Sequence, residues 1–227
     1  MRILVACEES QAVCKAFREK GHEAYSCDII ECSGGHPEWH IMQDVIPLLN
    51  GRCSFKTCDG SEHIIEGKWD MIIAFPPCTY LTVTGNRWFD VIRYQKAAQD
   101  RWLERCKAII FFLRLALADC GKVIVENPIG IMNTHFRSPD QIIHPYYFAE
   151  TEDDENCERK ATCLWLKGVK LLTYDIKYSP RIIHYKNGKG TDSPWHVNTM
   201  KLPSDERARV RSKTFPGIAK AMADQWG

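Results

Sequence analysis

The chain has 227 residues, enough for one domain with a substantial core but too few for two full domains of ordinary size. Hydrophobic residues make up 44% of the chain and charged residues 26%, an ordinary globular composition that argues against a disordered or fibrous protein. The formal net charge of +1 provides no overall basic field of the kind that marks many nucleic-acid-binding proteins. It does not exclude a local basic patch.

The apolar runs of the sequence predict neither a signal peptide nor a membrane-spanning helix. The apolar run near the N-terminus is too short for the hydrophobic region of a signal peptide, and no run approaches the roughly 18 residues needed to cross a bilayer. The 11 cysteines are an odd number and lack the dense spacing of a disulfide framework. We therefore expect a soluble, cytoplasmic protein in a reducing compartment, with no membrane partner.

The first half of the chain alternates strands and helices. Residues 1–6 predict a strand, helical spacing follows through Val13 and Phe17, and residues 23–27 predict a second strand that ends on Asp28. Residues 55–60 resemble a hairpin with a tight turn at Asp59-Gly60, and residues 71–74 predict a third strand. A strand, helix and strand in this order indicate a parallel sheet.

The second half continues this alternation and then changes character. Residues 91–119 predict a long helix, 123–125 a buried strand cut by Asn127-Pro128, and 161–166 another strand. Residues 171–190 are polar and rich in turns, and 203–226 return to helical spacing. The whole predicts an open α/β sheet with helices on both faces, in which ligands bind beyond the carboxyl ends of the strands. Three such ends carry reactive groups: Glu8, Cys78 and Glu126.

Two of these strand ends suggest chemistry. Cys78 follows two prolines after an apolar strand, and this rigid turn suits a nucleophile at the mouth of a site, although a cysteine after a turn is more often structural. Glu126 ends the strand Val123-Ile-Val, where poor solvation would raise its pKa and keep it protonated, although a strand-terminal Glu often simply faces water. Each motif strengthens the functional interpretation of the other.

The order of these motifs resembles that of the cytosine 5-methyltransferase family, in particular its short, phage-associated members. The resemblance rests on Ile3-Leu-Val-Ala-Cys-Glu-Glu-Ser, Asp28, Asp44, Phe75-Pro-Pro-Cys78 and Val125-Glu126-Asn-Pro, and it spans nearly the whole chain. It implies a Rossmann-like methyltransferase sheet with a small C-terminal recognition appendage, S-adenosyl-L-methionine as cofactor, DNA as partner and a bacterial or phage-infected cell as the setting.

The resemblance implies roles for individual residues. Cys78 would attack carbon 6 of the cytosine, Glu126 would bind ring nitrogen 3 and the exocyclic amine, and Lys160 would replace an arginine of the family near the cytosine oxygen. Asp28 would bind the ribose and Asp44 the adenine amine. The remaining residues expected at the cofactor are Cys7, Glu8, Glu9, Ser10, Gln11, Ile29, Val45, Pro76 and Gly217.

The chain departs from the family in its first loop and in its size. Cys7-Glu-Glu-Ser10 replaces the usual glycine-rich turn. We expect a catalytic domain over residues 1–158, a substrate-recognition segment over 159–202 and C-terminal helices over 203–227. The cations and aromatic residues of the segment could contact phosphates and bases, or could form a solvated loop. They are Lys177, Arg181, Lys186, Lys189, Tyr174, Tyr178, Tyr185 and Trp195.

Other functions remain open at this point. The same chemistry could act on RNA or a free cytosine nucleotide, or the chain could be a non-catalytic relative that binds nucleic acid. Methylation of an exocyclic amine is disfavoured because Phe75, which precedes the prolines, cannot hydrogen-bond an amine. Cys53, Cys58 and His63 have loose spacing for zinc, a hairpin explains them, and we expect no metal.

Overall fold

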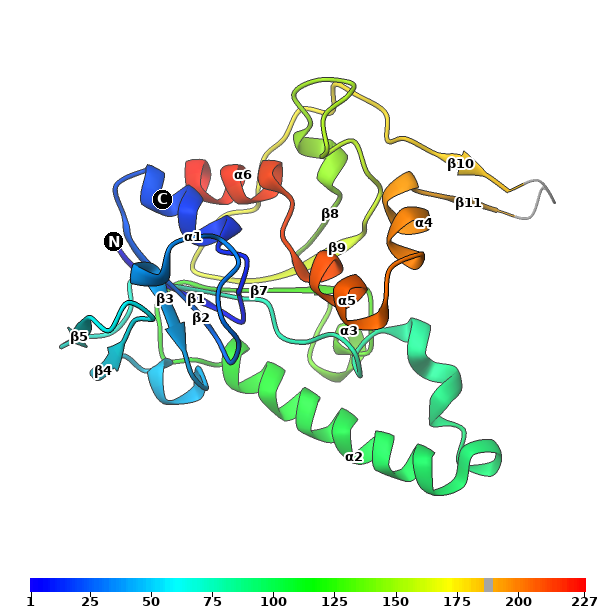
Figure 1. Ribbon diagram of the computed structural model, residues 1–227, viewed down its shortest axis with the longest axis horizontal. Coiled ribbons are helices and arrows are strands. Elements are labelled where there is room, and N and C mark those ends of the chain that lie inside the picture. The colour runs from blue at the N-terminus through cyan, green and yellow to red at the C-terminus, as the bar shows by residue number, and fades with distance from the viewer. Residues whose placement is uncertain (186–189) are drawn as a thin grey trace.

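The computed structural model describes residues 1–185 and 190–227 and is built on one seven-stranded sheet (Figure 1). Five strands run parallel: β1 (Arg2–Ala6), β2 (Glu23–Asp28), β3 (His40–Met42), β6 (Met71–Ala74) and β7 (Val123–Pro128). β9 (Thr162–Lys167) pairs antiparallel with both β7 and β8 (Gln141–Ile143). The strand order is β3-β2-β1-β6-β7-β9-β8, so the expected open and mostly parallel α/β sheet is confirmed.

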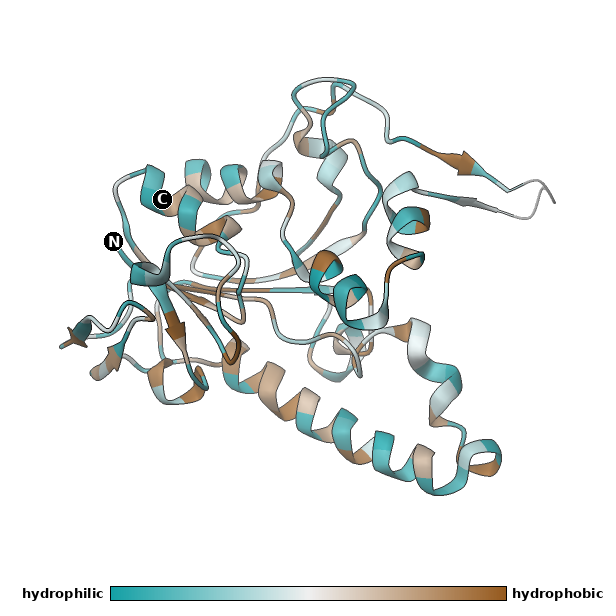
Figure 2. Ribbon diagram, in the orientation of Figure 1, coloured by the Kyte–Doolittle hydropathy of each residue, from teal (hydrophilic) through white to brown (hydrophobic). Residues whose placement is uncertain are grey.

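Helices cover both faces of the sheet because its inner strands are apolar on both sides. α1 (Ala12–Glu19) and α6 (Pro216–Trp226) lie on one face and α2 (Val91–Ala116) on the other (Figure 1). In β1, Ile3 and Val5 join the core cluster of α1 and α6, whereas Leu4 and Ala6 join the cluster of α2. Figure 2 shows hydrophobic residues on the half of α2 nearest the sheet and mostly hydrophilic ones on its outer half. Within the described residues, no helix is both long and apolar enough to cross a membrane.

The connections contain short elements. The two-stranded hairpin of β4 (Cys53–Lys56) and β5 (Glu62–Ile65) confirms the predicted turn, with Gly60 at φ 91°. The remaining elements are η1 (Pro37–Trp39), η2 (Ile46–Leu48), η3 (Val83–Phe89), α3 (Met132–His135), η4 (Pro145–Phe148), β10 (Ile183–His184), β11 (Thr191–Asp192), α4 (Pro194–Met200) and α5 (Ser204–Ser212).

The predicted long helix and the predicted strand at 123–125 are present with altered ends. α2 stops at Ala116 and is broken by Gln95, whose φ of 42° is not helical. The strand does not end at Val125 but runs on to Pro128, because the antiparallel neighbour β9 pairs with it as far as Thr162. The sequence predicted the strand β9, at residues 161–166, but not its antiparallel pairing with β7.

The segment 159–202 only partly stands out from the body. Its first part contains β9, which is a strand of the central sheet. The β10–β11 hairpin projects from the molecule (Figure 1). Lys186 and Lys189 lie outside the described residues.

The order of the strands reverses next to β1. From β1 the chain moves to β2 and β3 on one side and then returns to β6 and β7 on the other. Loops that leave β1 and β6 therefore turn to opposite sides, and in open α/β sheets the crevice that binds ligands lies at such a point. The residues after Ala6 and Ala74 border this crevice.

Candidate functional site

The loop that carries Cys78 is fixed to the end of β7 by a buried asparagine. Asn127, only 2% exposed, donates from Nδ2 to the carbonyl oxygen of buried Pro76 at 2.7 Å. The carbonyl of Cys78 accepts hydrogen bonds from the amides of Leu81 (2.9 Å) and Thr82 (3.0 Å), which close a turn behind the cysteine. The prolines and these three bonds hold Cys78 beside the strand end that carries Glu126.

A glycine permits the close approach of the two loops. A Cβ atom at Gly130 would lie 2.2 Å from the carbonyl oxygen of Leu81, which is too short for any side chain. The amide of Ile131 donates to that same carbonyl at 2.9 Å, and Thr82 forms a bridge with Gly130. The loops after β6 and β7 therefore form one unit.

Cys78, Glu126 and Lys160 act on one another electrostatically. Burial raises the pKa of the Cys78 thiol, the Glu126 carboxylate raises it further, and the Lys160 ammonium lowers it. Burial also raises the pKa of Glu126, while Lys160 and a hydrogen bond with Thr162 lower it. β9 runs antiparallel to β7, so its first residues lie at the same sheet edge as the carboxyl end of β7. The three expected catalytic residues are thus brought together.

We expect the alkylation of Cys78 to follow these charges. Because its pKa is raised, labelling by iodoacetamide should be slow at pH 7 and should rise steeply as the pH passes 9. Glu126→Gln should move the rate profile to lower pH and Lys160→Met to higher pH. Mass spectrometry of the labelled peptide gives the rate, with the exposed Cys106 as internal control. A profile that is identical in all three proteins would contradict the arrangement.

We expect Asn127→Ala to loosen the same loop. The substitution leaves the buried carbonyl of Pro76 without its donor, so the free energy of unfolding should fall by about 1–3 kcal/mol. Urea denaturation measures this change. Asn133→Ala, which removes a half-buried amide with only a 3.9 Å contact to a sulfur atom, is the matched control and should cost clearly less.

Lys160 has partners at the start of the C-terminal helices. Its Nζ donates to the carbonyl of Arg211 at 3.1 Å and lies 5.6 and 5.8 Å from the ring centres of Trp195 and Phe215. The Lys160 ammonium is therefore held between β9 and the C-terminal helices. Trp195 and Phe215, themselves 5.5 Å apart, form an aromatic wall there.

The acidic residues expected at the cofactor gather at the ends of β1, β2 and β3. The carboxylates of Asp28 and Asp44 both raise the pKa of the Cys7 thiol, after burial as the largest cause. Ile29, next to Asp28, is 76% exposed and offers an apolar surface. Burial also raises the pKa of Asp28, whose Oδ1 accepts from the amide of Ile29 at 2.7 Å.

Several residues expected at the cofactor turn their side chains elsewhere. Glu8 accepts from the amides of Val13 (2.6 Å) and Cys14 (3.1 Å), so its carboxylate caps α1. Gln11 is fully buried and is bonded to Ser26 and to both backbone groups of His36. The side chains of these residues hold the loop and the helix.

Val45 and Gly217, also expected at the cofactor, belong to the packing of the fold as well. Val45 is 4% exposed and belongs to the core cluster of α2. Gly217 donates its amide to Asn156 Oδ1 at 2.8 Å and is closed in by Asn156 and the carbonyl of Phe148.

The first loop achieves a tight turn without glycine. Cys7 and Gln11 take left-handed conformations, with φ of 60° and 58°, which cost a residue with a side chain roughly 1–2 kcal/mol each. The Glu8 cap and the hydrogen bonds of Gln11 offset this cost. The backbone of residues 7–11 therefore makes a tight turn after β1 without any glycine.

Glu8 should make stability depend on pH. Burial raises its pKa from the ordinary 4.5 to about 7, so the folded protein binds a proton that the unfolded chain releases between these values. The free energy of unfolding should therefore fall by roughly 3 kcal/mol as the pH rises from 4 to 8, and Glu8→Gln should lack this component. Denaturation at several pH values tests it, with Glu19→Gln, at an exposed position of the helix that Glu8 caps, as control. Equal pH dependence in wild type and Glu8→Gln would contradict it.

Glu9 is a buried carboxylate with unfilled hydrogen-bonding capacity. It is 6% exposed, and neither of its oxygens has a hydrogen-bond partner among the described residues. Arg209 of α5 approaches Oε1 only to 3.7 Å, too far for a hydrogen bond. Such a group at the crevice is suited to a cationic ligand.

Ser10 lies beside the first two residues of the motif Phe215-Pro-Gly217, at the start of α6. A hollow of about 330 Å³ is lined by Ser10, Ser33 and Gly34 on one side and by Thr214, Phe215 and Pro216 on the other. The motif Phe215-Pro-Gly217 therefore meets the first loop through Phe215 and Pro216.

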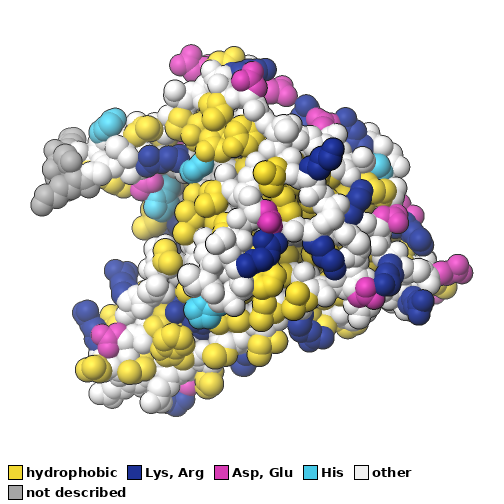
Figure 3. Space-filling model, turned by 180° about the vertical axis from the view of Figure 1, so that it is seen from behind, with side chains coloured by type: hydrophobic (Ala, Val, Ile, Leu, Met, Phe, Trp, Pro, Cys, Tyr) yellow, Lys and Arg dark blue, Asp and Glu magenta, His cyan; other side chains and the backbone are white. Residues whose placement is uncertain are grey.

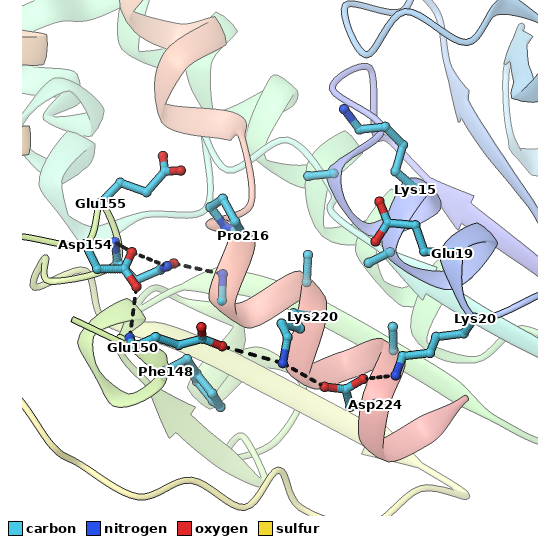
Figure 4. A pocket seen from close by; sticks show the side chains of 16 residues that line it. Lys15, Glu19, Lys20, Phe148, Glu150, Asp154, Glu155, Pro216, Lys220 and Asp224 are labelled. Carbon is cyan, nitrogen blue, oxygen red and sulfur yellow. Dashed lines mark hydrogen bonds and ion pairs between the residues drawn. The ribbon is translucent and has the colours of Figure 1, made fainter.

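A larger cavity, of about 740 Å³, lies between α1 and α6 and is separate from Cys78 and Glu126 (Figure 4). Some of its charged side chains are paired with one another: Lys220 contacts Glu150 (3.6 Å) and Asp224 (3.2 Å), and Lys20 contacts Asp224 (2.5 Å). The cavity is therefore a partly salt-bridged groove between helices, and neither Cys78 nor Glu126 lines it.

The expected recognition segment uses part of its polar and aromatic surface internally. Tyr174 stacks on Tyr147 at 4.5 Å, Arg181 pairs with Glu158 at 2.9 Å, and the Tyr185 hydroxyl donates to Asp192 at 2.9 Å. Lys177 is exposed.

Residues 53–63 form a hairpin whose histidine has protein partners. The ring nitrogens of His63 lie 3.1 Å from the hydroxyls of Tyr25 and Thr57. In the part of the chain that the structure describes, no three His, Cys, Asp or Glu side chains are grouped as metal ligands.

Comparisons with known proteins give matches among solved structures. No family model and no curated protein matches the chain. Among solved structures, it is similar to a prophage-encoded protein of E. coli named as a candidate DNA modification methyltransferase. The two chains share 10% identity with a TM-score of 0.45, over 80% of this chain and 52% of the other, so this chain spans about half the length of that protein.

Proposed function

We propose that this chain transfers a methyl group from S-adenosyl-L-methionine to carbon 5 of a cytosine in DNA through a covalent adduct of Cys78. The observation that carries the proposal is the meeting of Cys78, Glu126 and Lys160 at the carboxyl edge of the sheet, beside the crevice between β1 and β6. A thiol, a carboxyl group of raised pKa and a cation are the groups that addition to a pyrimidine requires.

The residues around the crevice suit S-adenosyl-L-methionine. The Glu9 carboxylate, which has no hydrogen-bond partner among the described residues and has Arg209 at 3.7 Å, fits a cationic group. The Asp28 carboxylate at the end of β2 fits the ribose hydroxyls. Exposed Ile29 fits the adenine face, and Asp44 fits its amine. Ser10 and the backbone of Cys7 and Pro76 would border the methionine end. When bound, the cofactor supplies an electrophilic methyl group.

Cys78 and Glu126 make the ring reactive. After its proton has passed to solvent, the Cys78 sulfur forms a bond to carbon 6. The electron pair of the carbon 5–carbon 6 double bond moves to the carbon 4–carbon 5 bond, and the carbon 4–nitrogen 3 pair moves onto nitrogen 3. Protonated Glu126 donates to nitrogen 3, while its other oxygen accepts from the exocyclic amine. Lys160 stabilises charge at the cytosine oxygen. Carbon 5 then has the electron density needed to take the methyl group, and S-adenosyl-L-homocysteine would be the thioether that leaves with the electron pair of the broken carbon–sulfur bond.

Release of the product reverses the addition. A base removes the proton from carbon 5, the double bond forms again, and the carbon 6–sulfur bond breaks to return Cys78 as a thiolate. The raised pKa of Cys78 favours reprotonation of that thiolate at neutral pH. We also propose that the segment 159–202 contacts the substrate and that residues 203–227 complete the catalytic domain.

Methyl transfer from labelled cofactor tests the proposal. The full chain is incubated with duplex DNA, single-stranded DNA and RNA, each with and without cytosine, and with cytidine nucleotides. The products are then digested to nucleosides. We expect label in 5-methylcytosine from DNA. Label on the exocyclic amine, or no transfer to any cytosine-containing substrate, would overturn the chemistry, whereas label in RNA or nucleotide alone would overturn only the substrate.

A further inference from the structure

The chain after Cys78 forms an arm that no part of the proposed chemistry uses. η3 and the outer turns of α2 project from the body (Figure 1), and Figure 3 shows the surface hollowed between this arm and the β10–β11 arm. The arm carries a hollow of about 500 Å³, here called the aromatic groove, lined by Tyr80, Trp88, Tyr94, Asp100, Arg101 and Glu104. This volume lies within the range of small-molecule sites.

The groove is held in a fixed position relative to Cys78. Arg105, 5% exposed, donates from Nε to the carbonyl of Tyr80 (2.9 Å) and from Nη2 to Asn86 Oδ1 (2.7 Å). Its guanidinium lies 3.3 Å from the ring centre of Phe89. Tyr80 is two residues from Cys78, a span of at most about 7 Å of chain. This distance corresponds to about two stacked nucleotides at 3.4 Å each.

The walls of the groove are aromatic rings accompanied by arginines. Trp88 is 42% exposed and lies 5.1 Å from Tyr94 between ring centres. Arg87 lies over Trp88 (4.7 Å), Arg93 over Tyr94 (5.4 Å) and Arg101 over Tyr80 (5.0 Å). The Nε of Arg101 is buried and has no hydrogen-bond partner among the described residues. Aromatic rings beside a hydrogen-bond donor without a partner, here the Nε of Arg101, suit a flat heterocycle.

The arm is basic although the whole chain is nearly neutral. Residues 79–116 contain seven Lys and Arg against three Asp and Glu, in a chain with a formal net charge of +1. All three carboxylates have partners: Asp90 caps α2, Asp100 pairs with Lys96, and Glu104 pairs with Lys107. Within the described residues, Arg87, Arg93 and Arg101 have no carboxylate within 4.0 Å. The arm is therefore complementary to an anionic partner with flat apolar groups.

We propose that the aromatic groove binds the base of a nucleotide next to the target cytosine, with the arginines of the arm on its phosphates. The inference rests on the proposed function, because the groove is placed by its connection to Cys78. A base can enter such a groove only when it is unpaired, so the substrate strand is single-stranded or locally opened beside the target.

Binding to oligonucleotides with one missing base tests the inference. Labelled single strands carry one cytosine, and an abasic nucleotide replaces each neighbour within two positions on either side in turn. Wild-type full-length chain should bind the intact strand roughly 5- to 150-fold more tightly than the strand that is abasic at the groove position. The double variant Trp88→Ala/Tyr94→Ala should bind the intact and the abasic strand equally well. Trp88→Phe/Tyr94→Phe should retain most of the wild-type preference for the intact strand. Leu103→Ala, at an exposed position of α2 outside the groove, should leave this preference unchanged.

The outcomes separate this inference from the proposed function. If the alanine double variant keeps the wild-type ratio, or if wild type shows no ratio at any position, the groove binds no base, even where methyl transfer to cytosine is observed. In a third case, no cytosine-containing substrate is methylated, but the preference for the intact over the abasic strand depends on Trp88 and Tyr94. The proposed function is then wrong, and the groove is still a nucleobase-binding site. An equal loss of affinity for intact and abasic strands in the alanine variant would also overturn the inference, since it shows a general defect.

Discussion

Replacing Cys78 by Ala is expected to abolish methyl transfer to cytosine, because it removes the sulfur that bonds carbon 6 and thereby activates carbon 5 in the proposed mechanism. Cys78→Ser should be equally inactive, since a hydroxyl at this half-buried position ionises far less readily than a thiol. Both variants should fold, because Cys78 contributes to the loop through its backbone carbonyl. Label incorporated into DNA measures the activity.

The covalent adduct gives the same prediction a second measurement. DNA with 5-fluorocytosine at the target should trap wild-type protein as a complex stable to denaturation, and mass spectrometry should locate the bond on the peptide containing Cys78. Cys106→Ala, which removes an exposed cysteine of α2, is the control and should trap DNA normally. Turnover that survives in Cys78→Ala would exclude the nucleophile and with it the proposed mechanism.

Replacing Glu126 by Gln is expected to lower kcat by about 10²- to 10⁴-fold, the range for loss of a positioned general acid. Burial raises the pKa of Glu126, which retains its proton to higher pH than an exposed glutamate, and glutamine cannot donate that proton to nitrogen 3. The affinity for S-adenosyl-L-methionine, measured by calorimetry, should change little. In wild type, the rate should also fall as the pH rises through the pKa of Glu126.

The same substitution should have the opposite effect on the free protein. Removing the negative charge of Glu126 lowers the pKa of Cys78, so alkylation should become faster while methyl transfer becomes slower. A variant that had merely unfolded would expose all of its cysteines at once. If Glu126→Gln slowed both reactions, the charge coupling between the two residues would be wrong.

The expectations from the sequence succeeded where the information was local. Short apolar runs and the helical spacing around Val13 and Phe17 identified the sheet and its first helix, because these patterns reflect which side chains face the core. The positions of Cys78 and Glu126 after apolar strands placed both at one sheet edge, since parallel strands bring their carboxyl ends together.

The direction of each loop side chain depended on distant partners. Glu8 and Glu9 are adjacent acidic residues, yet one caps α1 and the other meets Arg209 of α5, about 200 residues away. Asn127 could be seen in the sequence only as the end of a strand, and its bond to Pro76 exists because β6 and β7 are neighbours. The aromatic groove likewise depends on how α2 packs against the loop after Cys78.

The sequence by itself therefore determined an α/β sheet and the strand ends that carry a thiol and a carboxyl group, because periodic burial is encoded locally. Tertiary structure alone decided that β9 extends the pairing of β7, that Trp195 and Phe215 flank Lys160, and that the side chains of Glu8, Gln11 and Val45 serve the packing. These outcomes depend on contacts between residues far apart in the chain, which no local pattern specifies.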